Sequence, residues 1–228
     1  MSDDPVLHAV AHRALEFVRD DMIVGLGTGR AATAFVEALG ERVQQHHLRV
    51  TGVPTSKATA EVARRYGIPL VGFDDIEAID VTCDGADEVD PHLNLIKGYG
   101  GALVPEKIVA AASRMEIILV GSDKLVPVLG RRGVLPVEVI PFAAPFCARR
   151  LAKLGCRPRV RLNSGTPFVS DSGNHILDCG IDPLPDPHQL DHDIRGIPGV
   201  VGTGLFLDLA DLVLVGDPSG VRELRRDR

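Results

Sequence analysis

The chain contains no tryptophan, and aromatic residues make up only 4% of its 228 positions. Its core must therefore be built from aliphatic side chains, and a chain of this length can bury one large domain or a main domain with a smaller companion. Basic residues are also scarce, because 25 Lys and Arg stand against 31 Asp and Glu and leave a net charge of −6. This balance excludes the basic surface that nucleic acids and anionic membranes select, so we expect neither as a partner.

Targeting signals and paired cysteines are also missing from the sequence. No apolar run approaches the ~18 residues of a membrane span, and the opening Met-Ser-Asp-Asp-Pro does not begin a secretory signal. The cysteines show no Cys-x-x-Cys spacing; they are Cys83, Cys147, Cys156 and Cys179. Free thiols are typical of a reducing compartment, so we expect a cytoplasmic protein.

Short apolar runs alternate with amphipathic stretches over the first 130 residues. Residues 22–26 and 48–53 are typical of buried strands, and the positions between them follow helical spacing. This alternation predicts an α/β fold with a mostly parallel, Rossmann-like sheet flanked by helices. Shorter strands and turns follow, which predict a smaller α+β domain inserted before the C-terminal strand. The predicted domains are residues 1–130 with 204–228, and residues 131–203.

Local signals predict where individual elements begin and end. Gly40 is expected to end the helix that begins after Gly29, and Thr55 or Ser56 is expected to cap the next helix. The Arg-rich stretch Arg222–Arg228 predicts a solvated helical tail.

Carboxylates, an ammonium group and glycines gather within residues 84–107. Asp84 and Asp87 follow an apolar strand, Lys97 opens a glycine-rich turn, and Glu106 lies at the start of a predicted helix. These groups supply what is needed to remove a proton beside a carbonyl and to hold the resulting negative charge. The alternative is a polar loop surface, with the glutamate serving only the helix N-terminus. The glycines favour the functional interpretation, because they let backbone N–H groups approach a ligand.

The glycine-rich loop at residues 25–30, Gly-Leu-Gly-Thr-Gly-Arg, joins a strand to a helix. Such a junction favours an anion, because its N–H groups and the helix dipole point at the loop. The spacing is neither the dinucleotide fingerprint nor a P-loop. A tight turn that needs small residues is the alternative, and the position after a strand favours phosphate or sugar binding.

A metal site is not indicated. The eight histidines include no His-x-His or His-Glu-x-x-His pattern, and the acidic residues do not have the spacing of a calcium loop. We therefore expect no metal and no cofactor.

An ordered set of motifs resembles that of ribose-5-phosphate isomerase, type A, over nearly the whole chain. The matching segments are residues 25–29, 54–60, 84–90, 95–103, 106–108, 122–125, 135–139, 171–178 and 197–206. The resemblance implies a cofactor-free isomerase that interconverts ribose 5-phosphate and ribulose 5-phosphate through an enediolate, in the non-oxidative branch of the pentose phosphate pathway. It also implies a homodimer or larger homo-oligomer.

The resemblance assigns a role to each catalytic candidate. Glu106 would move the proton between C1 and C2, and Asp84, with Asp87 beside it, would handle ring opening and the protons on oxygen. Lys97 and the glycine turn would stabilise the enediolate. The implied substrate-binding residues are Gly27, Thr28, Gly29, Arg30, Ala31, Gly85, Ala86, Gly98, Tyr99, Gly100 and Lys124.

The chain departs from the family pattern at three places. Arg30-Ala31 stands where the family usually has Ser-Thr, and Leu7-His8 stands where many members carry lysine. Tyr99 replaces a usual glycine. We expect the bidentate guanidinium of Arg30 to replace the lost phosphate contacts. Tyr99 either covers the site or alters sugar selectivity.

Two other classes of function stay open. The chain could instead be a non-catalytic domain that senses a sugar phosphate, or another sugar-phosphate enzyme of the same fold group. A sensor predicts a fused helix-turn-helix or a basic patch, and the sequence shows neither.

Overall fold

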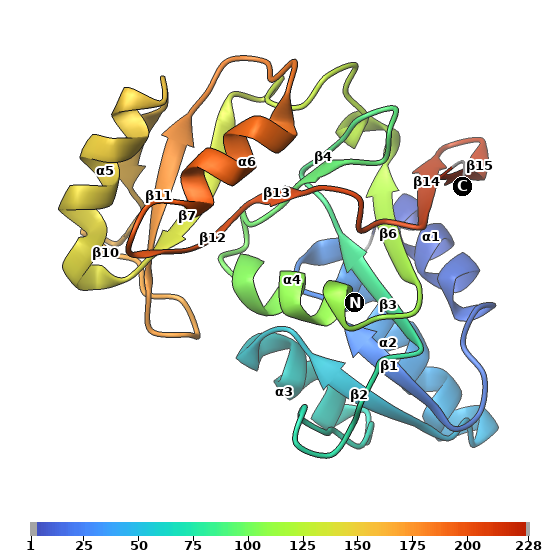
Figure 1. Cartoon of the computed structure of the whole chain (residues 1–228). Coiled ribbons are helices and arrows are strands. Elements are labelled where there is room, and N and C mark those ends of the chain that lie inside the picture. The colour runs from blue at the N-terminus through green and yellow to red at the C-terminus, as the bar shows by residue number, and fades with distance from the viewer. Residues whose placement is uncertain (1–3, 227–228) are drawn as a thin grey trace. The chain divides into compact units, whose positions relative to one another are not determined.

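The computed structural model describes residues 4–226, which form two compact units (Figure 1). The first unit comprises Met1–Ala86, Pro105–Lys124 and Leu209–Arg228. The second comprises Asp87–Val104 and Leu125–Asp208. The domain boundaries expected at residues 131 and 203 differ from these, because the segment around Lys97 belongs to the second compact unit. The expected ranges stay a prediction.

The first unit is built on a six-stranded sheet with the order β15-β14-β6-β3-β1-β2. All neighbouring strands are parallel except the C-terminal pair β14 and β15. The strands are β1 (Met22–Leu26), β2 (Val50–Pro54), β3 (Val81–Gly85), β6 (Glu116–Gly121), β14 (Leu212–Asp217) and β15 (Gly220–Arg225). The predicted parallel α/β fold is confirmed.

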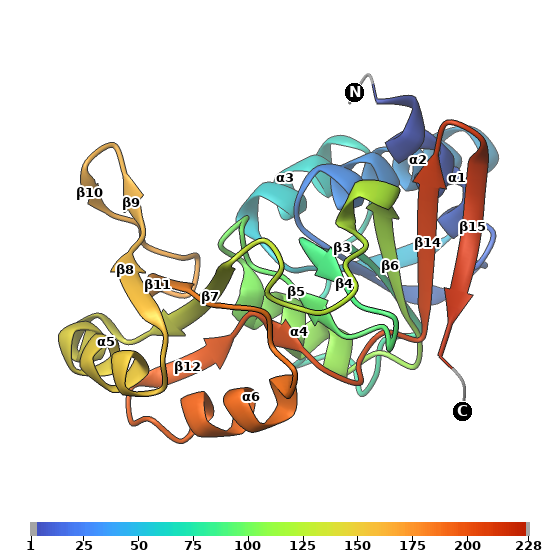
Figure 2. The ribbon, with the colours of Figure 1, turned by 90° about the horizontal axis from the view of Figure 1, so that it is seen from above.

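Helices cover both faces of this sheet (Figure 2). They are α1 (Pro5–Leu15), α2 (Arg30–His46), α3 (Lys57–Arg65) and α4 (Leu103–Ala111). Residues of β1 alternate between the two faces, as side chains of a strand do. Leu26 packs in the core that holds Phe35 and Leu39 of α2, whereas Ile23 packs with Val109 of α4 on the other face.

The expected end of α2 at Gly40 is wrong, because the helix continues to His46. A Cβ at Gly40 would lie 2.3 Å from Tyr66 Cβ, so this glycine provides room for close packing inside a helix. The expected cap of α3 is confirmed, since Ser56 Oγ accepts the Thr59 N–H at 3.1 Å.

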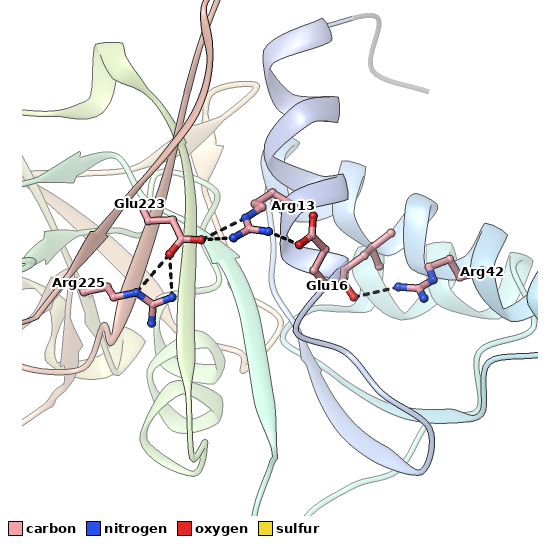
Figure 3. A network of polar contacts seen from close by, with 6 residues as sticks. Arg13, Glu16, Arg42, Glu223 and Arg225 are labelled. Carbon is pink, nitrogen blue, oxygen red and sulfur yellow. Dashed lines mark hydrogen bonds and ion pairs between the residues drawn. The ribbon is translucent and has the colours of Figure 1, made fainter.

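The predicted helical tail at Arg222–Arg228 is also wrong, and residues 227–228 lie outside the described part of the chain. β15 pairs antiparallel with β14 as a charged edge strand, a form that discourages further strand pairing. Figure 3 shows how Glu223 links this edge to α1. Its carboxylate accepts from Arg13 Nη2 at 2.6 Å and from Arg225 Nη2 at 2.7 Å. Hydrogen bonds from Arg13 and then Arg225 lower the pKa of Glu223.

The second unit contains a four-stranded antiparallel sheet with the order β12-β7-β11-β8. Its elements are β7 (Val134–Val139), β8 (Arg157–Val160), β11 (His175–Gly180), β12 (Val200–Thr203), the short helix η2 (Pro141–Ala143), α5 (Ala144–Lys153) and α6 (Pro187–Arg195). Leu151 of α5 and Ile194 of α6 pack with Val137 and Leu177 of the sheet. This architecture confirms the inserted α+β part.

Very short strands complete the second unit. β4 (Glu88–Val89), β5 (Leu95–Ile96) and β13 (Leu205–Phe206) form a three-stranded sheet, and β9 (Leu162–Asn163) pairs with β10 (Thr166–Pro167). The sequence did not predict β4, β5 and β13, because two residues do not establish a periodicity. β5 leads directly into Lys97, so this small sheet positions the glycine-rich turn.

Glu88 and Asp90 are buried and have structural roles. Glu88 accepts the N–H groups of Gly130 and Arg132 at 2.7 and 2.5 Å, and Asp90 accepts that of Asn94 at 2.9 Å. Within residues 4–226, no helix has both the length and the apolar character to cross a membrane.

Candidate active site

In the first unit, the candidate residues lie at the carboxyl edge of the parallel sheet. β1 lies between β2 and β3, so the loops that follow these strands meet at one edge. Open α/β sheets bind ligands at the carboxyl edge, at the point where the connections after two neighbouring strands run to opposite sides. Thr28 and Thr55 lie in the loops after β1 and β2, and Asp84 lies within β3, next to its last residue, at the same edge.

Gly27 lets the loop after β1 lie directly against the end of β3. A Cβ at this position would lie 2.3 Å from Asp84 Cγ. The Gly27 N–H donates to Cys83 O at 3.1 Å, and the Thr28 N–H donates to Asp84 Oδ1 at 3.1 Å. Asp84 Oδ1 also accepts the Gly85 N–H at 2.7 Å. The loop therefore fixes a carboxylate that is only 1% exposed.

Four hydroxyl groups surround the start of α2. Thr28 Oγ1 lies 2.7 Å from Thr55 Oγ1, 2.9 Å from Ser56 Oγ and 3.2 Å from Thr59 Oγ1. Gly29 is the N-cap of α2, has φ of +104° and gives the helix no side-chain cap. The first turn of α2 thus combines backbone donors with a hydroxyl cluster, a composition suited to an anion.

Thr55, Ser56 and Thr59 were missing from the predicted site. They lie in the segment 54–60 that resembles the family motif, and their three hydroxyl groups are a signal that the sequence offers. What the sequence did not show is that the loop after β2 meets the loop after β1.

Arg30 and Lys124 are cations of this unit. Arg30 opens α2 and donates from Nη2 to Asp4 Oδ2 at 3.1 Å, with 77% of its side chain exposed. Lys124 lies in the short helix η1 (Ser122–Lys124) after β6, and its Nζ is 3.6 Å from Asp123 Oδ2. Exposed ion pairs of this kind contribute little, so both cations can change partner at low cost.

Glu106 is in the first turn of α4 and is 5% exposed. The helix runs from the carboxyl side of the sheet to its amino side. At the amino side, Ala112 O accepts the Ile79 N–H at 3.0 Å. One turn earlier, Val109 packs at Gly25, which pairs with Thr82. Glu106 precedes Val109 by one more turn of the helix and therefore lies toward the carboxyl edge of the sheet.

Cys83 is not a candidate nucleophile. Burial raises the pKa of its thiol well above the ordinary value, and the nearby carboxylates of Glu116 and Asp84 add to the shift. A thiol that stays protonated is a poor nucleophile.

In the second unit, Lys97 opens a turn that its neighbours hold in place. Its N–H donates to Gly204 O at 2.9 Å, and its Nζ lies 5.3 Å from the centroid of the Phe206 ring. The side chain is 2% exposed. A cation kept this far from water interacts strongly with any negative charge that reaches it.

Asp87 and Tyr99 are joined within this turn. The Tyr99 N–H donates to Asp87 Oδ2 at 3.1 Å, and the Tyr99 hydroxyl donates to Val134 O at 3.3 Å. Burial, followed by the nearby carboxylates of Asp87 and Glu88, raises the pKa of Tyr99 to about 12. Its hydroxyl is therefore neutral at physiological pH.

The predicted site residues fall into two sets. The first unit contains Gly27, Thr28, Gly29, Arg30, Ala31, Asp84, Gly85, Ala86, Glu106 and Lys124, and the second contains Asp87, Lys97, Gly98, Tyr99 and Gly100. Across the described residues 4–226, no group of three or more His, Cys, Asp or Glu side chains is arranged to hold a metal ion. The groups present can donate and accept hydrogen bonds, accept protons and stabilise negative charge.

Solved structures share this architecture. Ribose 5-phosphate isomerase A from Methanocaldococcus jannaschii matches with a TM-score of 0.94 at 40% identity, over 98% of this chain and 100% of its own. A D-ribose-5-phosphate isomerase in complex with phospho-erythronic acid matches with a TM-score of 0.95 at 39% identity, over 99% and 100%.

The amino-acid sequence gives the same relationship. Residues 51–220 match the family model of ribose 5-phosphate isomerase A (phosphoriboisomerase A). The ribose-5-phosphate isomerase A of Roseiflexus castenholzii is 48% identical over 226 residues, covering 98% of this chain and 97% of the relative. That of Thermomicrobium roseum is 49% identical over 230 residues, covering 100% and 97%. The chain therefore belongs to the ribose-5-phosphate isomerase A family.

Proposed function

We propose that the chain interconverts D-ribose 5-phosphate and D-ribulose 5-phosphate by proton transfer between C1 and C2 through an enediolate, with no metal. The observation that carries this proposal is the 48% identity over 98% of the chain to an isomerase of nearly the same length. The buried Glu106 and Lys97 support it. A sensor of sugar phosphates would need an anion site but neither of these two groups, so the enzyme is favoured.

Glu106 is the base for the carbon-bound proton. A carboxylate is a weak base toward a sugar C–H. The rate therefore depends on lowering the energy of the enediolate, which fixed N–H donors and a cation achieve. Lys97 and the backbone of the turn after it supply these groups.

Asp84 and Asp87 handle the protons on oxygen. The sugar ring must open before C1 becomes a carbonyl, and both ring opening and enediolate formation move protons between oxygens. Asp84 Oδ1 is occupied by two backbone N–H groups, which hold the carboxylate in one orientation. Asp87 accepts the N–H of Tyr99 and so also fixes the turn.

The phosphate is held by the first turn of α2. Its backbone donors and the hydroxyl of Thr28 supply hydrogen bonds, Ser56 adds a hydroxyl, and Arg30 and Lys124 add positive charge. Arg30 leaves Asp4 to reach a doubly charged phosphate, because a weak pair at the surface is then replaced by a stronger one.

The first test replaces the proposed base. We expect Glu106→Gln to lower kcat by about 10² to 10⁴, because the amide cannot accept the carbon-bound proton. Melting temperature should stay close to that of the wild type. The matched control is Glu61→Gln on the exposed side of α3, which should leave kcat unchanged. The assay follows ribulose 5-phosphate formation with and without a chelator.

Near wild-type activity of Glu106→Gln would exclude this glutamate as the base. A wild-type protein without ribose 5-phosphate turnover would exclude the isomerase itself and favour a sensor or another substrate. Activity lost on adding the chelator would contradict the metal-free reaction.

The second test concerns the phosphate. We expect Arg30→Ala to raise KM for ribose 5-phosphate by about tenfold, the effect of losing one charge-assisted hydrogen bond, with little change in kcat. Arg49→Ala is the matched control, since Arg49 is also an exposed guanidinium paired with a carboxylate, Asp21. An unchanged KM for Arg30→Ala would show that Arg30 takes no part in holding the phosphate.

We also infer that the protein is a homodimer or larger homo-oligomer. Phe142 is 96% exposed, and Ile140 and Phe146 beside it in the chain are exposed too. Burying such side chains against a second copy removes apolar surface from water, at about 25 cal/mol per Å².

Analytical ultracentrifugation tests this assembly. We expect the wild type to sediment as a dimer or larger species and Phe142→Asp to shift toward monomer while keeping its far-UV circular dichroism. Phe73→Asp, at an exposed phenylalanine of the first unit, is the control and should leave the mass unchanged. A monomeric wild type, or an oligomeric Phe142→Asp, would contradict this interface.

A further inference from the structure

Arg161 is a largely buried cation of the second unit that follows β8, with 15% of its side chain exposed. It makes a bidentate ion pair with Asp178, with Nε–Oδ2 at 3.0 Å and Nη2–Oδ1 at 2.5 Å. Its Nη1 donates to Gly98 O at 3.0 Å and to Tyr99 O at 3.1 Å. The guanidinium carbon lies 5.8 Å from the centroid of the Phe168 ring. The side chain thus joins β11 to the turn after Lys97.

Arg157, which is in β8 just before Arg161, shows what an ordinary ion pair looks like here. Arg157 donates from Nη2 to Asp182 Oδ1 at 3.1 Å, and both side chains are mostly exposed. That pair lies on the surface and contributes little. Arg161 differs because it is buried and because its remaining donor nitrogen serves two consecutive carbonyl groups of the turn. A stabilising ion pair alone does not require this second set of contacts.

The two carbonyl contacts determine where the N–H groups of the turn point. In a trans peptide unit the C=O and the following N–H point in opposite directions. With Gly98 O directed at Arg161, the Tyr99 N–H points away, and it meets Asp87 Oδ2 at 3.1 Å. With Tyr99 O also directed at Arg161, the Gly100 N–H points away from the guanidinium as well. Two successive N–H groups are thus oriented away from the arginine.

The turn closes with its own hydrogen bond from the Gly101 N–H to Gly98 O at 3.0 Å, and Arg161 adds support from outside the turn. Gly98 and Gly101 have φ of +105° and +85°, so the backbone adopts left-handed conformations that glycine also leaves readily. A guanidinium on the carbonyl side restricts the peptide planes and polarises them, which makes their N–H groups better donors. A guanidinium has five N–H donors in a fixed plane, so it can bind these carbonyl groups and a carboxylate at the same time. An ammonium group cannot do both.

We propose that Arg161 is a positioning residue of the isomerase reaction. Anchored by Asp178, it fixes the peptide units from Gly98 to Gly100, so that the Tyr99 N–H stays on Asp87 and the Gly100 N–H faces the oxyanion of the enediolate. The proposal rests on the proposed function, because it assigns the turn to the enediolate. Arg161 itself contacts the carbonyl side of the turn, opposite the N–H groups.

Arg161→Met tests this role, because it keeps an unbranched apolar stem and removes every donor. We expect kcat to fall by about 10 to 10², less than the loss of an oxyanion donor itself, with KM for ribose 5-phosphate within about threefold. Phospho-erythronic acid carries a carboxylate where the enediolate forms, so its Ki should rise by a similar factor to the fall in kcat/KM.

Two further variants separate positioning from stability. Arg161→Lys keeps the charge but cannot pair with Asp178 and bind both carbonyl groups, so it should lose kcat and inhibitor affinity while remaining folded. Arg157→Met removes the exposed ion pair between β8 and Asp182 and should leave both kcat and the inhibitor affinity unchanged. All variants are assayed at a temperature at which circular dichroism shows them folded.

Wild-type kcat and Ki in a folded Arg161→Met or Arg161→Lys would overturn the proposal, even with a lower melting temperature. If Arg161→Met does not fold, Arg161→Lys decides. This failure is distinct from failure of the proposed function, in which the wild type itself would not turn over ribose 5-phosphate.

Discussion

The contact between Gly27 and Asp84 determines the arrangement of the first unit's candidate site. A side chain at residue 27 would overlap the carboxylate, which is 2.3 Å from where its Cβ would stand. Because the loop lies so close, the Thr28 N–H reaches Asp84 and the Thr28 hydroxyl reaches the cluster after β2. One missing side chain thus places a fixed carboxylate next to the start of α2, where we propose that the phosphate binds.

The second unit solves a different problem, that of holding a glycine-rich turn in one conformation. Backbone groups orient well only if the surrounding structure prevents alternatives. The turn after Lys97 is held from one side by Asp87 and from the other by Arg161, with Gly204 O accepting the Lys97 N–H. Burying the charge of Lys97 has a desolvation cost that the stability of the fold does not explain, and our proposal that Lys97 stabilises an enediolate does explain it.

Much of this could be predicted from the sequence, and the rest depended on distant contacts. β1 has the predicted bounds, and Ser56 caps α3, because short apolar runs and capping residues act locally. The position of Gly40 inside α2 depends on Tyr66, and the strand β15 depends on β14. Local patterns do not contain such information.

The candidate site also contains residues that local patterns predict and residues that depend on distant contacts. Asp84 and Lys97 were recognisable because strand ends and glycine turns are visible in the sequence. Arg161 was not, since Gly98 is 63 positions away along the chain and Asp178 is 17 positions away. The hydroxyl groups of Ser56 and Thr59 likewise become candidates only because the loop after β2 meets the loop after β1, a contact that the sequence does not show.

The most direct test of the account is a crystal structure of this chain with phospho-erythronic acid. We expect the phosphate at the first turn of α2 beside Thr28, the carboxylate at Lys97 and the N–H of Gly100, and the Glu106 carboxylate facing the carbon chain. An inhibitor bound elsewhere, or with Glu106 directed away from its carbon atoms, would contradict the account.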